Sequence, residues 1–236
     1  MSDLQQMREF LAESSFFALT LSLLGYEAGL IVKKKLNNSL CNPLLISIIF
    51  VMAAVKFLNM DYEVYEKGAS VLSYLLTPAT VCLAIPLYRQ LELLKKNMKA
   101  ILLGIFSGVL ASLGSVGVLC MVFHLPQNIT AALLPKSITT AIGMGVSEEL
   151  GGIVTITVAS IIITGVFGNI FAEVICKAAG IRHPIAKGLA VGTAAHAVGT
   201  ARAMEMGEIE GAMSSLSIAV AGLMTVAAAP LFFQLL

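Results

Sequence analysis

The sequence predicts an all-α, polytopic membrane protein, and three observations support this fold class. Hydrophobic residues make up 58% of the 236 positions, whereas Asp, Glu, Lys and Arg together make up 12%. The mean hydropathy is +0.91, a value that water-soluble domains do not reach. Four windows without any of these charged residues are each long enough to cross hydrocarbon as a helix: 69–88, 100–123, 150–172 and 211–236.

Taken in order along the chain, hydropathy and loop charge predict about seven membrane-spanning helices in a single domain, 1–236. The expected spans are 14–32, 42–58, 69–88, 98–122, 151–176, 185–204 and 211–235. We also consider two pseudo-symmetric halves, about 14–122 and 131–236. Paired hydrophobic segments of this kind are common in transporters, where two repeats face each other.

Lysine and arginine in the short loops set the expected orientation. The basic loops at 33–35, 89–99 and 177–187 are predicted to lie in the cytoplasm. The N-terminus and the acidic segment "RAMEMGEIEG", which starts at Arg202, are then expected on the opposite side.

The segment "LLPKSITTAIGMGVSEELGG", residues 133–152, is polar and rich in glycine. Because the neighbouring loops allow only an odd number of crossings here, 133–150 is predicted to be a re-entrant hairpin, with a loose helix in a cavity as the alternative. The expected break is at Gly143 and Gly145, with Ser147 capping a second short helix. Irregular backbone at membrane depth requires burial in protein or contact with water.

Within this segment, "PKSITT" supplies Lys136, Ser137, Thr139 and Thr140 near the start of a helix. An ammonium, hydroxyl groups and free backbone amides together favour a carboxylate or phosphate. The alternative is a lysine among lipid headgroups with ordinary capping hydroxyls. Glu148 follows, and an intramembrane carboxylate is a candidate proton carrier, whereas Glu149 is expected to be solvated.

A second polar group lies in "GTAAHAVGTARAMEMGEIEG", residues 192–211. His196 and Thr200 follow Gly192 at helical spacing with Thr193 beside them, which predicts a polar strip on one helix face. His196 is predicted to bind an anion or move a proton, or else to hydrogen-bond across a packed interface. Arg202 is predicted either to bind a carboxylate or to extend to the headgroups.

A weak internal similarity adds two hydroxyls to the predicted site. "TPATVCLAIP" aligns with "TAAHAVGTAR", so that Thr77 matches Thr193 and Thr80 falls opposite His196. Paired interrupted segments often meet at the substrate site of transporters, although a match this short also arises by chance.

Composition also excludes several functions. A net charge of +1 leaves no basic surface for nucleic acid. The sequence contains no catalytic triad, phosphate-binding loop, dinucleotide fingerprint or cluster of metal ligands. We therefore expect neither an enzyme nor a bound metal or cofactor.

Three long motifs carry a family resemblance: "LLTPATVCLAIPLYRQLELLKKN", "LLPKSITTAIGMGVSEELGGI" and "RHPIAKGLAVGTAAHAVGTARAMEMGEIEGAMSSL". In this order they closely resemble the LrgB/CidB family of bacterial inner-membrane proteins, from about residue 15 to the end. The resemblance implies two competing functions. One is a holin/antiholin-like modulation of murein hydrolase activity and cell lysis, with a small LrgA/CidA-type membrane partner. The other is transport of small monocarboxylates, as in a related plastid glycolate/glycerate carrier.

The polar groups inside the apolar segments favour a carrier, because a pore needs no dedicated binding site. We predict transport of small 2-oxo or 2-hydroxy monocarboxylates of the pyruvate, glycolate, glycerate or lactate type. Proton coupling through Glu148 and His196 is expected, as are a small LrgA/CidA-type partner and a homo-oligomer in the bacterial cytoplasmic membrane.

Overall fold

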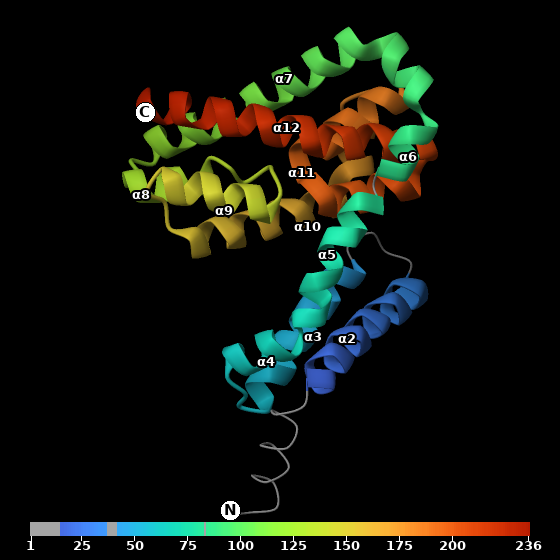
Figure 1. Cartoon of the computed structure of the whole chain (residues 1–236), viewed down its shortest axis with the longest axis vertical. Helices are drawn as coiled ribbons and strands as arrows, with labels where there is room; N and C mark the ends of the chain where they lie inside the picture. The colour runs from blue at the N-terminus through green and yellow to red at the C-terminus, as the bar shows by residue number, and fades with distance from the viewer. Residues whose placement is uncertain (1–14, 37–41, 83) are drawn as a thin grey trace, which may run out of the picture. The chain divides into compact units, whose positions relative to one another are not determined.

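The computed structural model describes residues 15–36, 42–82 and 84–236, and their regular structure is helical throughout. The all-α prediction is confirmed for these residues. The chain divides into two compact units, residues 1–82 and 83–236 (Figure 1). Four of the described helices have the length and hydropathy needed to cross a membrane: α2, α7, α10 and α12, whose bounds follow below.

The first unit contains α2 (Ser15–Leu36), α3 (Pro43–Phe57), α4 (Tyr62–Gly68) and α5 (Ser70–Cys82). Asn42 caps α3, since its Oδ1 accepts the amide of Leu44 at 2.8 Å. The helices α2 and α3 pack closely at Gly29, where an added Cβ would meet the carbonyl oxygen of Pro43 at 2.5 Å. The predicted spans 14–32 and 42–58 correspond to these two helices.

The second unit contains α6 (Ala84–Arg89), α7 (Leu91–Val122), α8 (Gln127–Leu133), α9 (Thr140–Glu149), α10 (Val154–Ala178), α11 (Pro184–Met206) and α12 (Glu208–Gln234). The predicted span 69–88 is thus divided between α5 and α6, with residue 83 outside the described part.

The helices α7 and α12 run in the same direction. Arg89, just before α7, lies 3.8 Å from Glu208 at the start of α12. At the other end, a Cβ on Gly117 would meet the side chain of Leu236 at 3.0 Å. A stripe at four-residue spacing on α7, from Ile101 to Leu113, is buried in the core that these helices share.

The helix α11 is a hairpin. Ala195 (φ −131°, ψ 16°) and His196 (φ 41°, ψ −139°) interrupt the helical backbone. Beyond them the chain folds back, because a Cβ on Gly199 would lie 3.1 Å from the carbonyl oxygen of Val191. In a straight helix Val191 and Gly199 would be about 12 Å apart along the axis. We call residues 184–206 the second hairpin, with a first arm at 184–194 and a second arm at 197–206.

The neighbours of α11 confirm the reversal. Ser214 of α12 approaches both arms: its backbone packs against Gly192, and its hydroxyl lies 2.7 Å from that of Thr200. Along α10, the first arm runs antiparallel and the second arm runs parallel, since Asn169 contacts Val198 and Glu173 contacts Arg202. The second hairpin therefore begins and ends at the same end of the unit.

A first hairpin, residues 127–149, consists of α8, a turn at 134–139 and α9. Neither α8 nor α9 is long enough to cross about 30 Å of hydrocarbon. The helix α9 is antiparallel to α10, because Ser147 bonds to Thr157 and Gly143 packs against Ile161. The tip of the first hairpin thus points into the unit from the end where α10 begins.

Two predictions about these segments are wrong. The segment 185–204 does not cross the unit, so the acidic segment after Arg202 lies at the same end as the basic residues that precede and open α7. Acidic residues carry little weight in membrane orientation, and Glu208 here lies beside Arg89. In the first hairpin, α9 is continuous through Gly143 and Gly145, and Ser147 lies inside it rather than capping it.

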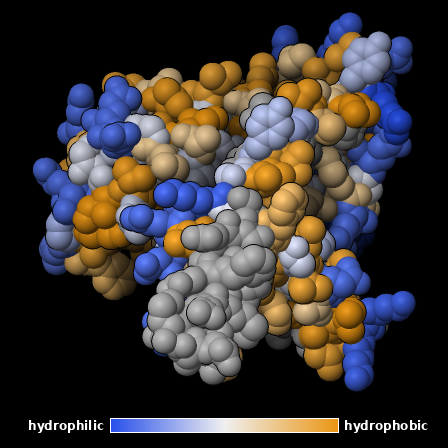
Figure 2. All heavy atoms as spheres, turned by 60° about the horizontal axis from the view of Figure 1, so that its bottom comes forward, coloured by the Kyte–Doolittle hydropathy of each residue, from blue (hydrophilic) through white to orange (hydrophobic). Residues whose placement is uncertain are grey.

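Large apolar side chains point outward from the long helices. Examples are Leu103 and Val118 on α7 and Phe167 on α10, all more than half exposed. Figure 2 shows hydrophobic residues over much of the visible surface. Such surfaces suit lipid tails, and the chain is accordingly a multi-pass membrane protein.

Within the second unit a pattern recurs in inverted orientation. The helix α7 is followed by a hairpin that enters from the end where α7 finishes, and α10, which runs the opposite way, is followed by a hairpin that enters from the end where α10 finishes. This repeat covers 91–149 and 154–206. The wider halves 14–122 and 131–236 remain a prediction.

Candidate functional site

A cleft of about 1140 Å³ lies in the second unit between α7, α10 and the first arm of α11. Small residues dominate the faces of α7 and α11 that line it, including Gly104, Gly108 and Ala194. Its polar lining residues are Asn97, Ser107, Ser112, Ser115, Lys136, Ser137, Thr164, His183 and Thr193.

The cleft runs along the length of α7. Asn97 and His183 line it near the basic end of the unit, and Ser115 lines it near the other end. Asn97 and Ser115 are separated by about 27 Å of helix. Lys136 and Ser137, at the tip of the first hairpin, line the end of the cleft that is far from the basic residues.

The first hairpin and α7 together place an ammonium and two hydroxyls at this end of the cleft. Lys136 Nζ donates to Ser137 Oγ at 3.1 Å, and Ser112 Oγ of α7 donates to the same oxygen at 2.9 Å. Because Ser137 Oγ accepts both bonds, its own proton is available to another acceptor. Among the described residues, Lys136 has no carboxylate within ion-pair distance, so most of its N–H donors are also available.

The tip of the second hairpin packs against Gly165 and Gly168 of α10, which we call the glycine seat. A Cβ on Gly165 would meet His196 Nε2 at 2.9 Å, and one on Gly168 would overlap the Cβ of Ala195. The buried imidazole of His196 donates from Nε2 to the carbonyl of Ile161 at 3.0 Å. This bond fixes the neutral tautomer with its proton on Nε2.

The two hairpin tips approach each other at mid-depth. Ser112, which holds the first tip, and Gly108, which Thr193 contacts, are one turn apart on α7. One turn corresponds to about 6 Å along the axis. The ammonium of Lys136 is also close enough to the imidazole of His196 for the two groups to interact electrostatically. Lys136, Ser137 and Thr193 therefore line the same cleft, whereas His196, at the tip of the second hairpin, packs against α10.

Thr193 and Thr200 have different surroundings. Thr200 is fully buried, donates to the carbonyl of His196 at 2.9 Å and pairs with Ser214, so it supports the backbone where the hairpin turns. Thr193 lines the cleft and is buried, but its Oγ1 has no hydrogen-bond partner among the described residues. The predicted single strip of Gly192, His196 and Thr200 on one straight helix does not exist, because the helix turns at His196.

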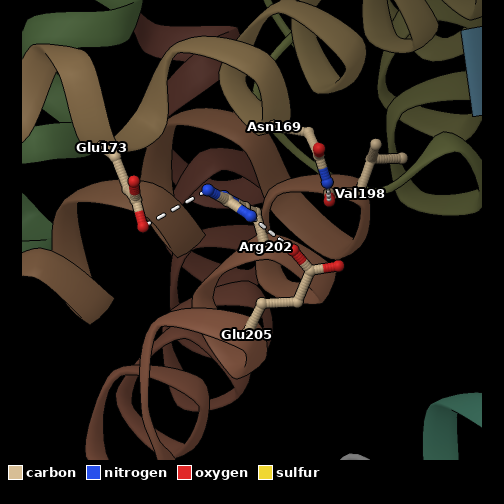
Figure 3. A network of polar contacts seen from close by, with 5 residues as sticks. All are labelled: Asn169, Glu173, Val198, Arg202 and Glu205. Carbon is tan, nitrogen blue, oxygen red and sulfur yellow. Dashed lines mark hydrogen bonds and ion pairs between the residues drawn. The ribbon is translucent and has the colours of Figure 1, made fainter. Parts of the chain in front are cut away.

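Arg202 belongs to a separate polar network on the second arm (Figure 3). Its guanidinium lies 3.3 Å from Glu173 of α10 and also pairs with Glu205. One turn nearer the tip, Asn169 Nδ2 donates to the carbonyl of Val198 at 2.7 Å. These contacts tie the second arm to α10, and Arg202 does not line the cleft.

Of the other predicted residues in the second unit, none lines the cleft. Thr139 and Thr140 are half-buried where α9 begins, and Glu148 is exposed on that helix. Thr77 and Thr80 belong to α5 in the first unit, and their side chains are outside the described part. Within the described residues no three His, Cys, Asp or Glu side chains are grouped as metal ligands.

Sequence reasoning missed Ser112, Asn169, Glu173 and the glycine pair at 165 and 168. Ser112 sits in an apolar span and has no distinguishing neighbours. The pair of glycines three residues apart in "GVFG" was the available signal, because small residues at this spacing allow close approach of another segment.

Comparison with known proteins identifies relatives along nearly the whole chain. Residues 22–235 match the model of the LrgB-like family. Proteins named antiholin-like protein LrgB from Bacillus mycoides (strain KBAB4) and Bacillus cereus (strain B4264) are each 37% identical over 218 residues, which covers 92% of this chain and 95% of theirs. No solved structure matches.

Proposed function

The chain belongs to the LrgB-like family, and we propose that it carries small 2-oxo or 2-hydroxy monocarboxylates across the bacterial cytoplasmic membrane. The observation that supports this most directly is Lys136 in the cleft, at the tip of the first hairpin. Lys136 is partly buried and has no carboxylate partner among the described residues, so an anionic ligand would offset the cost of removing its ammonium from water. The free proton of Ser137 adds a second donor beside it.

The shape of the site favours a small ligand. The two hairpins contact α7 about one helical turn apart, at Ser112 and Gly108, and glycine and alanine line the cleft beside them. A carboxylate of two or three carbons would bind Lys136 and Ser137 while the rest of the molecule faces Thr193.

Alternating access follows from the two hairpins. The cleft reaches from the basic, cytoplasmic end to the first hairpin, so this arrangement corresponds to a state open to the cytoplasm. Outward release requires the first hairpin to move away while the second closes the cytoplasmic path. Carriers with inverted repeats exchange the roles of equivalent elements in this way.

We further propose that transport is coupled to protons and that the chain works with a second membrane protein. Proton coupling would use His196, which lies beside the cleft, or Glu148, which is exposed on α9 of the first hairpin. A small LrgA/CidA-type membrane protein is the expected partner from the family resemblance, and a homo-oligomer is the alternative assembly.

The names of the relatives support a second candidate, an antiholin-like role. A pore would conduct solutes without saturation, and neither a pore nor a lysis modulator would depend on the ammonium of Lys136. The two candidates therefore differ in how they respond to substitution of Lys136.

The test is uptake of radiolabelled pyruvate, glycolate and lactate into proteoliposomes, with and without the partner and a pH gradient. We expect saturable uptake, a loss of at least about 100-fold in Lys136→Ala and partial activity in Lys136→Arg, because breaking a charge-assisted contact in a desolvated site costs about 3 kcal/mol. Lys187→Ala, at the basic end of the unit, is the matched control and should transport normally. Saturable uptake unaffected by Lys136→Ala would exclude this site, and unsaturable leakage would favour the pore.

A further inference from the structure

We propose that Thr193 distinguishes acids with an oxygen on C2 from acids without one. The proposal rests on the carrier function above and assigns a specificity role to one residue. In this role Lys136 and Ser137 hold the carboxylate common to all candidate substrates. Thr193 Oγ1 bonds the hydroxyl or keto oxygen on the adjacent carbon.

The first argument is the missing hydrogen bond. Thr193 is only 6% exposed, and its Oγ1 is the one buried side-chain polar atom of the described residues without a partner. Other hydroxyls at helix contacts in this unit are paired: Thr200 with Ser214, Thr157 with Ser147, and Ser112 with Ser137. A buried hydroxyl without a partner lowers stability, so such groups are rare unless a ligand completes them.

The second argument is position. Thr193 lines the cleft on the first arm of the second hairpin, three residues before the break, and faces Gly108 of α7. Ser112, one turn along α7, holds Ser137 and, through it, Lys136. A carboxylate bound to Lys136 and Ser137 therefore has its C2 substituent within about 6 Å of the level of Thr193.

The third argument is the freedom of the side chain to turn. A Cβ on Gly108 would lie 2.7 Å from Cγ2 of Thr193 but 3.8 Å from Oγ1, so the methyl group fills the contact with α7. Threonine in helices divides between two χ1 rotamers. Rotation about χ1 moves the hydroxyl to another of the three positions around Cβ, and a ligand oxygen in the cleft favours the rotamer that presents Oγ1 to it.

This role makes opposite predictions for stability and binding. Valine matches threonine in shape but has no hydroxyl to leave unpaired. Thr193→Val should therefore keep or raise the melting temperature of the ligand-free protein, while it weakens binding of 2-oxygenated acids. A purely structural hydroxyl would give the reverse, a lower melting temperature with unchanged selectivity.

The experiment compares uptake of pyruvate and lactate with that of acetate and propionate by the intact chain and its partner in proteoliposomes. The unmodified protein should favour pyruvate over propionate. In Thr193→Val this ratio of kcat/KM should fall by about tenfold, mainly through a higher KM for pyruvate, since a neutral hydrogen bond contributes at most about that factor. Thr193→Ser should keep most of the selectivity, and in Thr193→Val propionate uptake should fall less than pyruvate uptake.

The outcomes separate this proposal from the carrier function. Unchanged selectivity in Thr193→Val, or an equal loss for all four acids, overturns the role of Thr193 and leaves the carrier function standing. Absence of saturable uptake by the unmodified protein overturns both. If Thr193→Val fails to fold, Thr193→Ser and Thr193→Ala decide: selectivity must survive in the first and fall in the second.

Discussion

The two hairpins of the second unit reach similar depths from opposite ends, but they turn in different ways. The first turns through a short irregular segment, residues 134–139, that contains a proline and several polar side chains. The second turns at two residues, Ala195 and His196, inside a sequence of small residues. The first tip can therefore be recognised in the sequence as a polar interruption of an apolar segment. The position of the second tip depends instead on the residues that pack against it.

The forces that hold the tips differ accordingly. Hydroxyl pairs hold the first hairpin, with Ser112 bonded to Ser137 at its tip and Thr157 bonded to Ser147 along α9. The second also has hydrogen bonds, from His196 to Ile161 and between Thr200 and Ser214, but its tip depends in addition on close packing, because Gly165 and Gly168 leave room for His196 and Ala195. We infer that the first tip tolerates changes of volume better than the second.

The strongest test of this difference is a methyl group at the glycine seat. In Gly168→Ala the new Cβ would occupy the space of Ala195, and this overlap should destabilise the unit by about 1–3 kcal/mol and abolish most uptake. Thermal unfolding in detergent and proteoliposome uptake measure the two effects.

Gly145→Ala is the matched control, since a Cβ there meets nothing within 4 Å. It lies inside α9, so alanine should stabilise the helix by about 0.5–1 kcal/mol. A large loss in Gly145→Ala would contradict the continuous α9, and a neutral Gly168→Ala would contradict the seat.

The second test concerns the strained residue at the turn. His196 has φ 41° and ψ −139°, a conformation that favours glycine and costs other residues about 1–3 kcal/mol. His196→Ala keeps this strain and loses the bond to Ile161, whereas His196→Gly relieves the strain. Among the variants, unfolding temperatures should therefore rank glycine above alanine.

If the imidazole also serves transport, both variants should lose uptake despite their different stabilities. Equal unfolding temperatures would show that the turn is not strained at His196. Full uptake in His196→Gly would remove the imidazole from the transport mechanism.

These differences explain what the sequence could and could not predict. A lysine, a proline and hydroxyls inside an apolar chain identify the first hairpin, because such groups are costly in lipid. The break at His196 is not predictable from its neighbours, since alanine and glycine on either side fit a straight helix equally well. It results from packing against Gly165, Gly168 and Ser214, which are distant in sequence.

The helix bounds themselves were predicted well where hydropathy determines them. The expected spans 151–176 and 211–235 correspond to α10 and α12 within three residues at each end. The span at 185–204 has similar bounds in α11, but bounds alone do not tell whether a helix continues or reverses. Because α11 reverses, the acidic segment that follows Arg202 lies at the opposite end of the unit from the one predicted.

A third, smaller test addresses the hydroxyl pair at the first tip. Ser112→Ala removes the donor to Ser137, which should cost about 0.5–1.5 kcal/mol of stability. Ser137 then bonds only Lys136, so the ammonium is held less firmly and KM should rise about two- to tenfold with little change in kcat. Ser115→Ala, which lines the same cleft and bonds only within α7, is the control. Equal effects in both variants would argue against a specific role for the pair.

The smallest effect on stability is expected at Arg202, where the second arm meets α10. Its ion pairs with Glu173 and Glu205 are partly exposed, and such pairs contribute about 0–1 kcal/mol. Arg202→Met should therefore barely change the unfolding temperature. It should nevertheless loosen the second arm, because only Asn169 then ties that arm to α10 through a polar contact among the described residues.

If movement of the second arm accompanies each transport cycle, Arg202→Met shifts the balance of states rather than the stability of either. The expected result is a change in kcat of about two- to fivefold with KM unchanged, since losing a partly exposed ion pair shifts the balance by less than about 1 kcal/mol. Glu173→Gln should reproduce it, and the double variant should add little, because both substitutions break the same pair. Additive losses in the double variant would show that the two residues act separately and would overturn the role of their ion pair in transport.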